Sequence, residues 1–310
     1  MTRHAFTALA TDGRLDLAVA RGVAGLSRRK ARTLIAQGCV FVDGARIRVQ
    51  ARTVKAGARI EVSVDAGIDA APAFPILHDG DGVVVVDKPA GLATEPTRQA
   101  ATSVTETFRN QRRAATAIHR LDVDTTGVLL LAIDENALRV WSKLFHDQQV
   151  ERVYTAIVHG IVQGPAGAND DVLIDAPLLP PDRSGRARVG VVGKRAITGV
   201  HVLARSATAS LLRVIPETGR THQIRVHLAH LGHPLIGDHR YGEGRAAHLG
   251  LHARSLAAVV DNRRFSFCAP LPVAFVDAAR AAGLALPPEL SAGSSPGSDE
   301  PSSPLEQSGP

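Results

Sequence analysis

A short polar stretch directly before an apolar run is the first candidate for chemistry. His119, Arg120, Asp122 and Asp124 precede Val128–Ile133, a run whose length is typical of a central strand. Polar side chains at the edge of such a strand commonly form functional sites. A carboxylate can act there as a nucleophile or as a general base. A plain strand-entry turn has the same composition, so the residues alone leave both interpretations open.

A second candidate is the turn Gly219-Arg220, which precedes a helix predicted from Thr221 to about Leu231. A guanidinium and free backbone N–H groups at a helix start suit an anion such as phosphate or carboxylate. An arginine that pairs with a carboxylate for structure alone is the alternative. Tyr154 is a third candidate, because it is one of only two tyrosines in the chain. A buried core tyrosine is the simpler interpretation of that residue from sequence alone.

The sequence predicts neither a metal nor a nucleotide cofactor. His222, His227 and His230 lie near one predicted helix, but the H-E-x-x-H pattern is missing, and Cys39 and Cys268 are too few for a thiolate zinc site. The glycines form neither G-x-x-x-x-G-K-[ST] nor a G-x-G-x-x-G after a strand. The chain also lacks a G-x-S-x-G nucleophile turn.

The composition indicates a folded protein of about two domains, with 310 residues and 45% hydrophobic residues. We expect a cytoplasmic protein without a membrane partner, because the sequence holds no apolar run of about 18 residues and no apolar signal core at its start. Residues 1–65 hold 12 Lys and Arg against 5 Asp and Glu, whereas the whole chain has a net charge of +6. This asymmetry favours a front module that binds a polyanion, with an ordinary basic face as the alternative.

The front module predicts a helix from Arg28 to about Gln37, capped by Ser27, then a hairpin with its turn at Asp43-Gly44 and a strand over residues 60–64. Four cations crowd the first helical turn, where each opposes the helix dipole by a few tenths of a kcal/mol. An anionic partner that binds these four cations would offset this cost. The four residues are Arg28, Arg29, Lys30 and Arg32.

The body, residues 75–285, mixes predicted strands and helices, so we expect an α+β protein. Its strands are predicted over residues 83–86, 128–133, 153–158 and 211–215, and Asp134 is predicted to cap a helix. Residues 66–74 are a predicted linker. Residues 291–310 hold 14 Ser, Pro and Gly, so we expect this tail to be disordered.

Two parts of the chain resemble known families. The pattern L-S-R-R-K-A-x-x-L-I-x-x-G-x-V-x-V-D-G, within residues 14–65, is similar to the small RNA-binding module of the S-four type. H-R-L-D-V-D-T-T-G, R-V-Y-T-A-I-V-H-G and E-T-G-R-T-H-Q-I-R-V-H occur in the order found in RNA pseudouridine synthases of the H-R-L-D group. V-V-V-D-K-P-A-G-L and L-H-A-R-S-L fit the same family, whose fold is a mixed, mainly antiparallel sheet.

The resemblance implies roles for individual residues. Asp122 matches the catalytic aspartate, Tyr154 the tyrosine against the target base, and Arg220 the arginine that pairs with the aspartate. It also implies an RNA partner, with ribosomal RNA favoured by the front module and transfer RNA as the other candidate. The reaction is a redox-neutral isomerisation, so it needs no cofactor or metal. RNA contacts are expected from Arg28, Arg29, Lys30, Arg32 and Arg120.

The mechanism and two rival functions stay open at this stage. Asp122 could attack the sugar, attack the base or take a proton from the sugar. A glycosidase would use two carboxylates, for which Asp122 and Asp124 are the candidates, and would release free uracil. An RNA-binding or ribosome-assembly protein would explain the front module but not Asp122, Tyr154 or Arg220.

Overall fold

The computed structural model describes residues 2–291 except 25, 37–38, 48, 65–73, 97–101, 111–112, 165–169, 183, 245 and 247. The predicted linker, apart from Phe74, and the predicted tail after residue 291 therefore lie outside the described residues. The chain divides into two compact units. The first combines residues 1–73 with residues 95–113, and the second combines residues 74–94 with residues 114–310.

The first unit is a four-stranded antiparallel sheet covered by two helices. The sheet order is β1-β4-β2-β3, and α1 and α2 pack on a core that includes Leu15, Leu34 and Ile60. Because β1 pairs with β4 along its length, the sheet of this unit also includes residues before residue 14. The elements are β1 (Thr2–Thr7), α1 (Leu15–Gly22), α2 (Arg28–Ala36), β2 (Val40–Val42), β3 (Ala45–Ile47) and β4 (Arg59–Val64).

The predicted cap of α2 is present, since the Lys30 backbone N–H donates to Ser27 Oγ at 3.2 Å. One further helix belongs to this unit, α3 (Val104–Asn110). Residues 95–113, which lie within the predicted body of residues 75–285, group with the first unit by their contacts. The predicted domain boundaries stay predictions.

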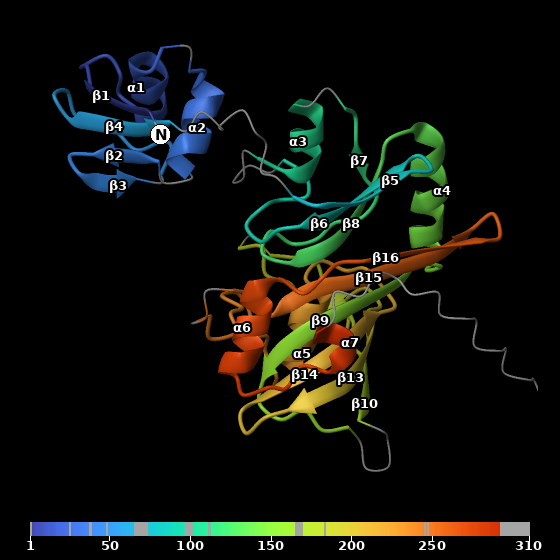
Figure 1. The fold of residues 1–310 in the computed structure, drawn as a ribbon. Helices are drawn as coiled ribbons and strands as arrows, with labels where there is room; N and C mark the ends of the chain where they lie inside the picture. Colours follow the sequence, from blue (N-terminus) through green and yellow to red (C-terminus); the bar gives the residue numbers. More distant parts are fainter. Residues whose placement is uncertain are drawn as a thin grey trace, which may run out of the picture. The chain divides into compact units, whose positions relative to one another are not determined.

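The second unit is built on a ten-stranded sheet, in the order β10-β13-β14-β9-β15-β8-β6-β5, with β16 paired to β15 and β7 to β8 (Figure 1). Every pair is antiparallel except β15 with β8, so the predicted mixed, mainly antiparallel sheet is confirmed. A separate pair joins β11 to β12. The strands are β5 (Ile76–Gly80), β6 (Val83–Lys88), β7 (Thr116–Ala117), β8 (Thr126–Ala132), β9 (Glu151–His159), β10 (Asp171–Asp175), β11 (Leu178–Leu179), β12 (Arg188–Val189), β13 (Ile197–Arg205), β14 (Ala209–Pro216), β15 (Leu251–Val260) and β16 (Arg263–Cys268).

Helices bury the apolar faces of this sheet. Trp141 of α4 (Glu135–His146) packs with Leu130 and Phe267, and Asp134 caps the helix by accepting from the Ala137 N–H at 2.7 Å. Phe275 of α6 (Val273–Ala281) packs against residues of β9 and β14, close to the short helix α7 (Pro288–Ser291). Val226 of α5 (Gln223–His230) packs toward β11 and β12.

The parallel pair β15–β8 comes very close at Gly127. A Cβ at this position would lie 2.1 Å from the Ala253 carbonyl oxygen, and the φ of +108° is one that other residues rarely adopt. Next to it, Thr126 Oγ1 lies 2.8 Å from His252 Nδ1, inside the sheet. This contact fixes the start of β8 and hence the end of the loop that carries Asp122.

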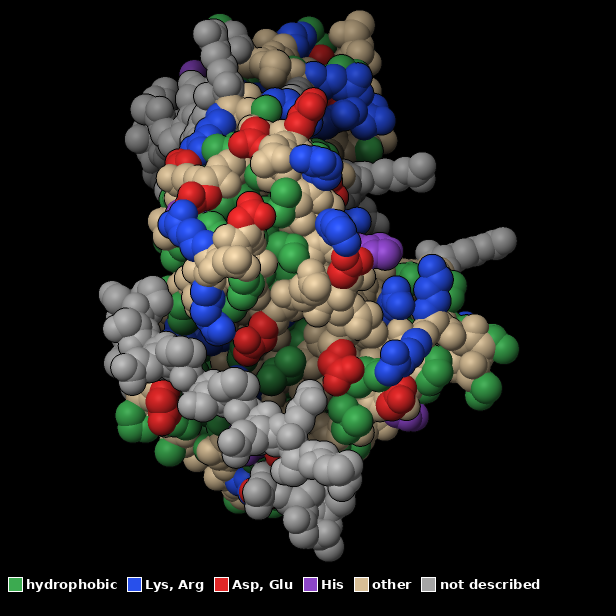
Figure 2. Space-filling model, turned by 90° about the vertical axis from the view of Figure 1, so that its right-hand side faces the viewer, with side chains coloured by type: hydrophobic (Ala, Val, Ile, Leu, Met, Phe, Trp, Pro, Cys, Tyr) green, Lys and Arg blue, Asp and Glu red, His purple; other side chains and the backbone are tan. Residues whose placement is uncertain are grey.

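The described residues contain no helix that is long and apolar enough to cross a membrane. Figure 2 shows one face of the molecule, on which Lys and Arg side chains lie interspersed with Asp and Glu side chains.

Candidate active site

Asp122 lies in the loop between β7 and β8, and the structure holds this loop on both sides of it. Thr94 Oγ1 accepts from the Leu121 N–H at 3.1 Å and donates to the Leu121 carbonyl at 3.0 Å. Lys88 Nζ donates to the Val123 carbonyl at 3.0 Å. The Asp122 side chain itself keeps 27% of its surface exposed. The carboxylate is therefore accessible while its backbone is fixed.

Lys88 is fully buried at the end of β6. Its ammonium also donates to the carbonyls of Pro89 at 2.9 Å and Leu92 at 2.8 Å. Burial lowers the Lys88 pKa to about 8, although nearby Asp124 and Asp122 raise it. We did not assign Lys88 a role from sequence. The sequence did contain a sign of this role, because Lys88 ends an apolar strand and a buried lysine needs hydrogen-bond or ionic partners.

Arg225 of α5 is the partner of Asp122. Its Nη1 donates to Asp122 Oδ2 at 2.9 Å, while Nε and Nη2 both donate to Asp238 at 2.8 Å. Burial disfavours the guanidinium cation, but the two carboxylates outweigh this and raise the Arg225 pKa. Asp238 is fully buried and also accepts from the backbone N–H groups of Arg240 and Tyr241. Asp238 therefore anchors Arg225, whose third nitrogen faces Asp122.

In the structure Arg225, rather than the expected Arg220, pairs with Asp122. Arg220 is exposed, and its Nε donates to the Arg195 carbonyl at 3.0 Å. Its backbone N–H is also occupied, because it donates to Gln223 Oε1 at 3.0 Å. This N–H is therefore already hydrogen-bonded and is not free to bind an anion at the predicted turn. Arg220 lies before α5, which begins at Gln223, two residues later than expected, whereas Arg225 lies in the first turn of α5 and contacts Asp122.

A signal for Arg225 was present in the sequence. It lies between Ile224 and Val226 in a helix predicted to bury an apolar face. A charged side chain in such a position needs an opposite charge, since an unpaired buried charge is very costly.

Tyr154 lies in the middle of β9 and is almost completely buried. Burial raises the pKa of its hydroxyl, Arg152 lowers it and the charge of Asp122 raises it, so Tyr154 and Asp122 share one electrostatic environment. The phenol therefore stays protonated near neutral pH. Arg152, two residues earlier, donates to the carbonyls of Pro216 and Thr218 and so ties β9 to the turn before α5.

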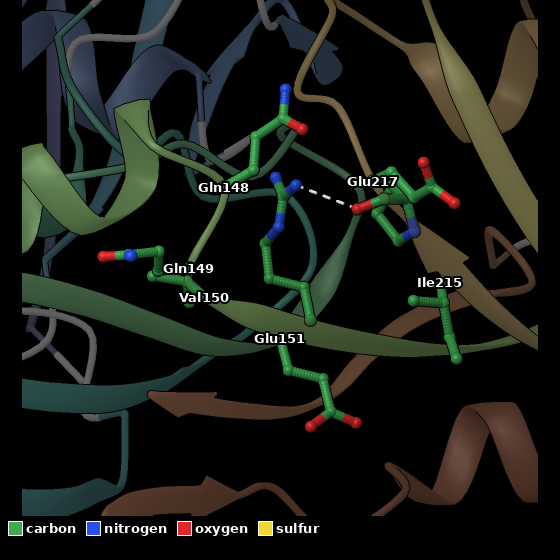
Figure 3. A pocket seen from close by; sticks show the side chains of 8 residues that line it. Gln148, Gln149, Val150, Glu151, Ile215 and Glu217 are labelled. Carbon is green, nitrogen blue, oxygen red and sulfur yellow. Dashed lines mark hydrogen bonds between the residues drawn. The ribbon is translucent and has the colours of Figure 1, made fainter. Parts of the chain in front are cut away.

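The same stretch of β9 borders a hollow of about 450 Å³ (Figure 3). Its lining combines apolar residues such as Val150 and Ile215 with polar ones, among them Glu151, Arg152 and Glu217. Two carboxylates around one arginine do not favour a phosphate there.

His119, the first residue of the H-R-L-D motif, has a structural environment. Its Nε2 accepts from the Leu130 N–H at 3.0 Å, and its ring stacks on Phe145 with 4.9 Å between centroids. Burial lowers its pKa to about 3, assisted by the charge of Arg152. His119 is therefore neutral at physiological pH and positions the motif rather than carrying charge.

The described residues contain no group of three His, Cys, Asp or Glu side chains placed to hold a metal. His227 is fully buried, with Nδ1 2.9 Å from Thr198 Oγ1 and Nε2 2.9 Å from the Ala176 carbonyl. Both of its ring nitrogens are therefore already engaged within the protein.

The predicted RNA-binding residues fall in both units. In the first unit Arg28 and Arg32 converge on Asp16, with Nε to Oδ2 distances of 3.0 and 2.7 Å, and Arg14 joins them at 3.0 Å. Lys30 lies on the same helix, and the side chain of Arg29 lies outside the described parts. In the second unit Arg120 is exposed two residues before Asp122.

Comparisons with known proteins agree with this geometry. The family model described as RNA pseudouridylate synthase matches residues 82–230, and the model described as S4 domain matches residues 13–60. The chain is 38% identical to an uncharacterized RNA pseudouridine synthase of Zymomonas mobilis, over 63% of this chain and 92% of that protein. It is 37% identical to Ribosomal large subunit pseudouridine synthase C of Yersinia pestis, over 70% and 71%. The solved structure of Human RNA Pseudouridylate Synthase Domain Containing 4 aligns with a TM-score of 0.57 at 26% identity, over 68% of this chain and 94% of that one.

Proposed function

The chain belongs to the RNA pseudouridine synthases, and on that premise we propose that it modifies uridines of large-subunit ribosomal RNA with Asp122 as the catalytic carboxylate. The observation that carries the proposal is the ion pair of a partly exposed Asp122 with a buried Arg225 that Asp238 anchors. A charge-assisted hydrogen bond from a fixed arginine orients the carboxylate. The arginine role expected of Arg220 accordingly passes to Arg225.

The reaction breaks the bond between N1 of uracil and C1′ of ribose and forms a bond between C5 and C1′. N1 gains a proton and C5 loses one, so the overall change is an isomerisation and atoms and charges balance. Asp122 serves this reaction as a nucleophile or as a base. Tyr154 supplies an aromatic face for the base, and its protonated hydroxyl supplies a hydrogen-bond donor.

Recognition of folded RNA needs contacts that offset the cost of extruding the target base, which is a few kcal/mol. Arg28 and Arg32 in the first unit and Arg120 beside the Asp122 loop are the proposed phosphate contacts. Arg29 and Lys30 belong to the same proposal by their place on α2. The ribosomal substrate is supported by the similarity to Ribosomal large subunit pseudouridine synthase C of Yersinia pestis and by the S4 domain match. The cytoplasmic location expected from the sequence stays a prediction.

The test uses RNA that carries tritium at C5 of uridine, because C5 loses its hydrogen when it bonds to C1′. Purified protein is incubated with 23S ribosomal RNA and, separately, with bulk transfer RNA. We expect tritium release from ribosomal RNA at a stoichiometry of a few sites per molecule, and none with Asp122→Asn. Tritium release from transfer RNA alone would overturn the ribosomal substrate. Free uracil among the products would indicate a glycosidase instead.

A further inference from the structure

His222 precedes α5 and has an unusual backbone, with φ 55° and ψ 23°. Residues other than glycine rarely adopt this left-handed conformation, and those that do cluster at functional sites. In this conformation Nε2 of the ring lies 3.8 Å from Asp122 Oδ1. The His222 side chain is 15% exposed and that of Asp122 is 27% exposed, so neither is closed off from solvent.

Tyr241 is the hydrogen-bond partner of His222 Nδ1. The Tyr241 hydroxyl oxygen accepts from the Ala187 N–H at 2.9 Å and lies 2.8 Å from His222 Nδ1. A hydroxyl has one proton and two acceptor lone pairs, so the oxygen that accepts from Ala187 still has its own proton to donate to Nδ1. In that arrangement Nδ1 is an acceptor, and the proton of the neutral ring lies on Nε2, the nitrogen 3.8 Å from Asp122.

The surroundings keep the ring neutral. Burial lowers the His222 pKa most, and Arg225 and Arg240 lower it further, while Asp122 and Asp238 raise it. Tyr241 also lies under the guanidinium of Arg225, with 5.3 Å from Cζ to the ring centroid. Tyr241 therefore contacts both His222 and Arg225, the arginine that pairs with Asp122.

The separation of 3.8 Å is too long for a hydrogen bond between Nε2 and Asp122. The Nε2 N–H is therefore directed at the space beside the carboxylate and is not hydrogen-bonded to Asp122. On the basis of the proposed function, we propose that His222 donates a hydrogen bond from Nε2 to a carbonyl oxygen of the target uracil, and that Tyr241 is the positioning residue that fixes this donor. When the bond from C1′ to N1 breaks, its electron pair leaves with the uracil, and such a donor stabilises the charge on the carbonyl oxygen.

The first test reads the tautomer in the intact protein. Protein labelled with ¹⁵N-histidine shows separate Nδ1 and Nε2 shifts for each ring, and comparison with His222→Gln assigns the signals of His222. We expect a neutral His222 with its proton on Nε2, and a mixture of tautomers in Tyr241→Phe. A proton on Nδ1 in the wild-type protein would overturn the proposal.

The second test is a double-mutant cycle on single-turnover rates with 23S ribosomal RNA. In His222→Asn the asparagine tolerates the left-handed backbone, but its amide is too short to reach the uracil carbonyl. The rate should therefore fall on the order of 10²-fold. His222→Gln places an amide N–H at a similar reach and should recover part of the rate. Tyr241→Phe should lower the rate about tenfold alone and less than about twofold in the His222→Asn background, because it acts through His222.

RNA dissociation constants, measured in the Asp122→Asn background, should change less than about threefold for each variant. An unchanged rate in His222→Asn, or an equal effect of Tyr241→Phe in both backgrounds, would overturn the proposal. A wild-type protein that forms no pseudouridine would instead overturn the proposed function. Activity in the wild type that is lost in Asp122→Asn leaves that function intact whatever the His222 variants show.

Discussion

Both units of the molecule contain an arginine–aspartate cluster, but the buried partner differs. It is the aspartate in the first unit and the arginine in the second. In the first unit the carboxylate of Asp16 is fully buried, and its partners Arg14, Arg28 and Arg32 keep 43%, 46% and 39% of their side chains exposed. In the second unit the cation is buried and Asp122 is partly exposed. The first arrangement presents positive charge to solvent, whereas the second presents a negative group.

The difference follows from which partner is anchored. Asp16 holds three arginines with two oxygens, which leaves an excess of positive charge at the surface that suits a phosphate backbone. Arg225 is held by Asp238 and directs one N–H at Asp122, so the surplus charge there is negative and partly exposed. We propose that the same pair of residue types serves RNA binding in one unit and the reaction in the other.

The largest expected effect comes from removing the exposed carboxylate. Asp122→Asn keeps the shape of the side chain and should lower the rate by about 10⁴-fold or more, because a central catalytic group is lost. Pseudouridine is quantified by mass spectrometry of digested RNA. Asp124→Asn is the matched control, two residues away and exposed, and should stay within about threefold. Equal losses in both variants would remove the distinction between Asp122 and its surroundings.

The second prediction separates the buried arginine from the exposed one. Arg225→Lys keeps a cation but cannot serve both carboxylates with the same planar geometry, so the rate should fall about 10²-fold. Arg220→Lys should change the rate at saturating RNA less than about threefold. Single-turnover rates of both variants decide between them, with circular dichroism to check folding. A larger loss with Arg220→Lys would restore the role that the sequence suggested for Arg220.

The third prediction concerns Lys88, a fully buried lysine of the second unit. Lys88→Met removes the ammonium that binds the Val123 carbonyl and leaves buried carbonyls without their donor. We expect a loss of about 2–3 kcal/mol in the free energy of unfolding and about a tenfold lower rate, since the Asp122 loop shifts. Urea unfolding and single-turnover kinetics measure the two effects. A stable variant with full activity would show that the loop does not depend on Lys88.

The fourth prediction tests the exposed arginines of the first unit. Arg28→Ala and Arg32→Ala should each weaken RNA binding about fivefold to tenfold, and each should reduce the salt dependence of binding by about one phosphate contact. The rate at saturating RNA should not change. Filter binding over a series of salt concentrations measures the slope. Unchanged slopes would mean that the Asp16 cluster serves the fold only.

The smallest effect is a pH dependence of the first unit. Burial raises the Asp16 pKa, but the hydrogen bonds from Arg14, Arg32 and Arg28 outweigh it and lower the value to about 2. Because the folded pKa is depressed, the stabilisation is present above about pH 4 and is lost as the pH falls toward 2. We expect about 1–2 kcal/mol, reduced by the solvent exposure of the arginines. Hydrogen exchange of residues 15–36 should show a difference between wild type and Asp16→Asn at pH 5 that shrinks at pH 3. A constant difference would contradict this account.

Local patterns predicted much of the fold. The apolar run after Gly127 predicted β8, and Asp134 predicted the cap of α4, because both depend on neighbouring residues only. The N-terminal strand β1 was missed, since its place is set by pairing with β4 more than fifty residues away. The helix α1 was likewise not anticipated from its short segment.

The candidate site was predicted in part for the same reason. The motifs identified Asp122 and Tyr154, which the structure brings into one electrostatic environment. They did not identify Arg225, Asp238 or the contact between His222 and Tyr241. Those partnerships depend on where α5 begins and on how the turn after residue 234 folds back against it. Neither feature can be read from the spacing of residues along the chain.

The central claim is that Asp122 of this chain converts uridine in ribosomal RNA. The most direct measurement is carbodiimide primer-extension mapping of pseudouridine in ribosomal and transfer RNA from cells that lack the protein. The mapping is repeated after complementation with wild type or Asp122→Asn. We predict that a large-subunit site is lost in the deletion and restored by the wild-type protein only. Restoration by Asp122→Asn would contradict the assignment of the site, and no lost site in either RNA would contradict the proposed substrate.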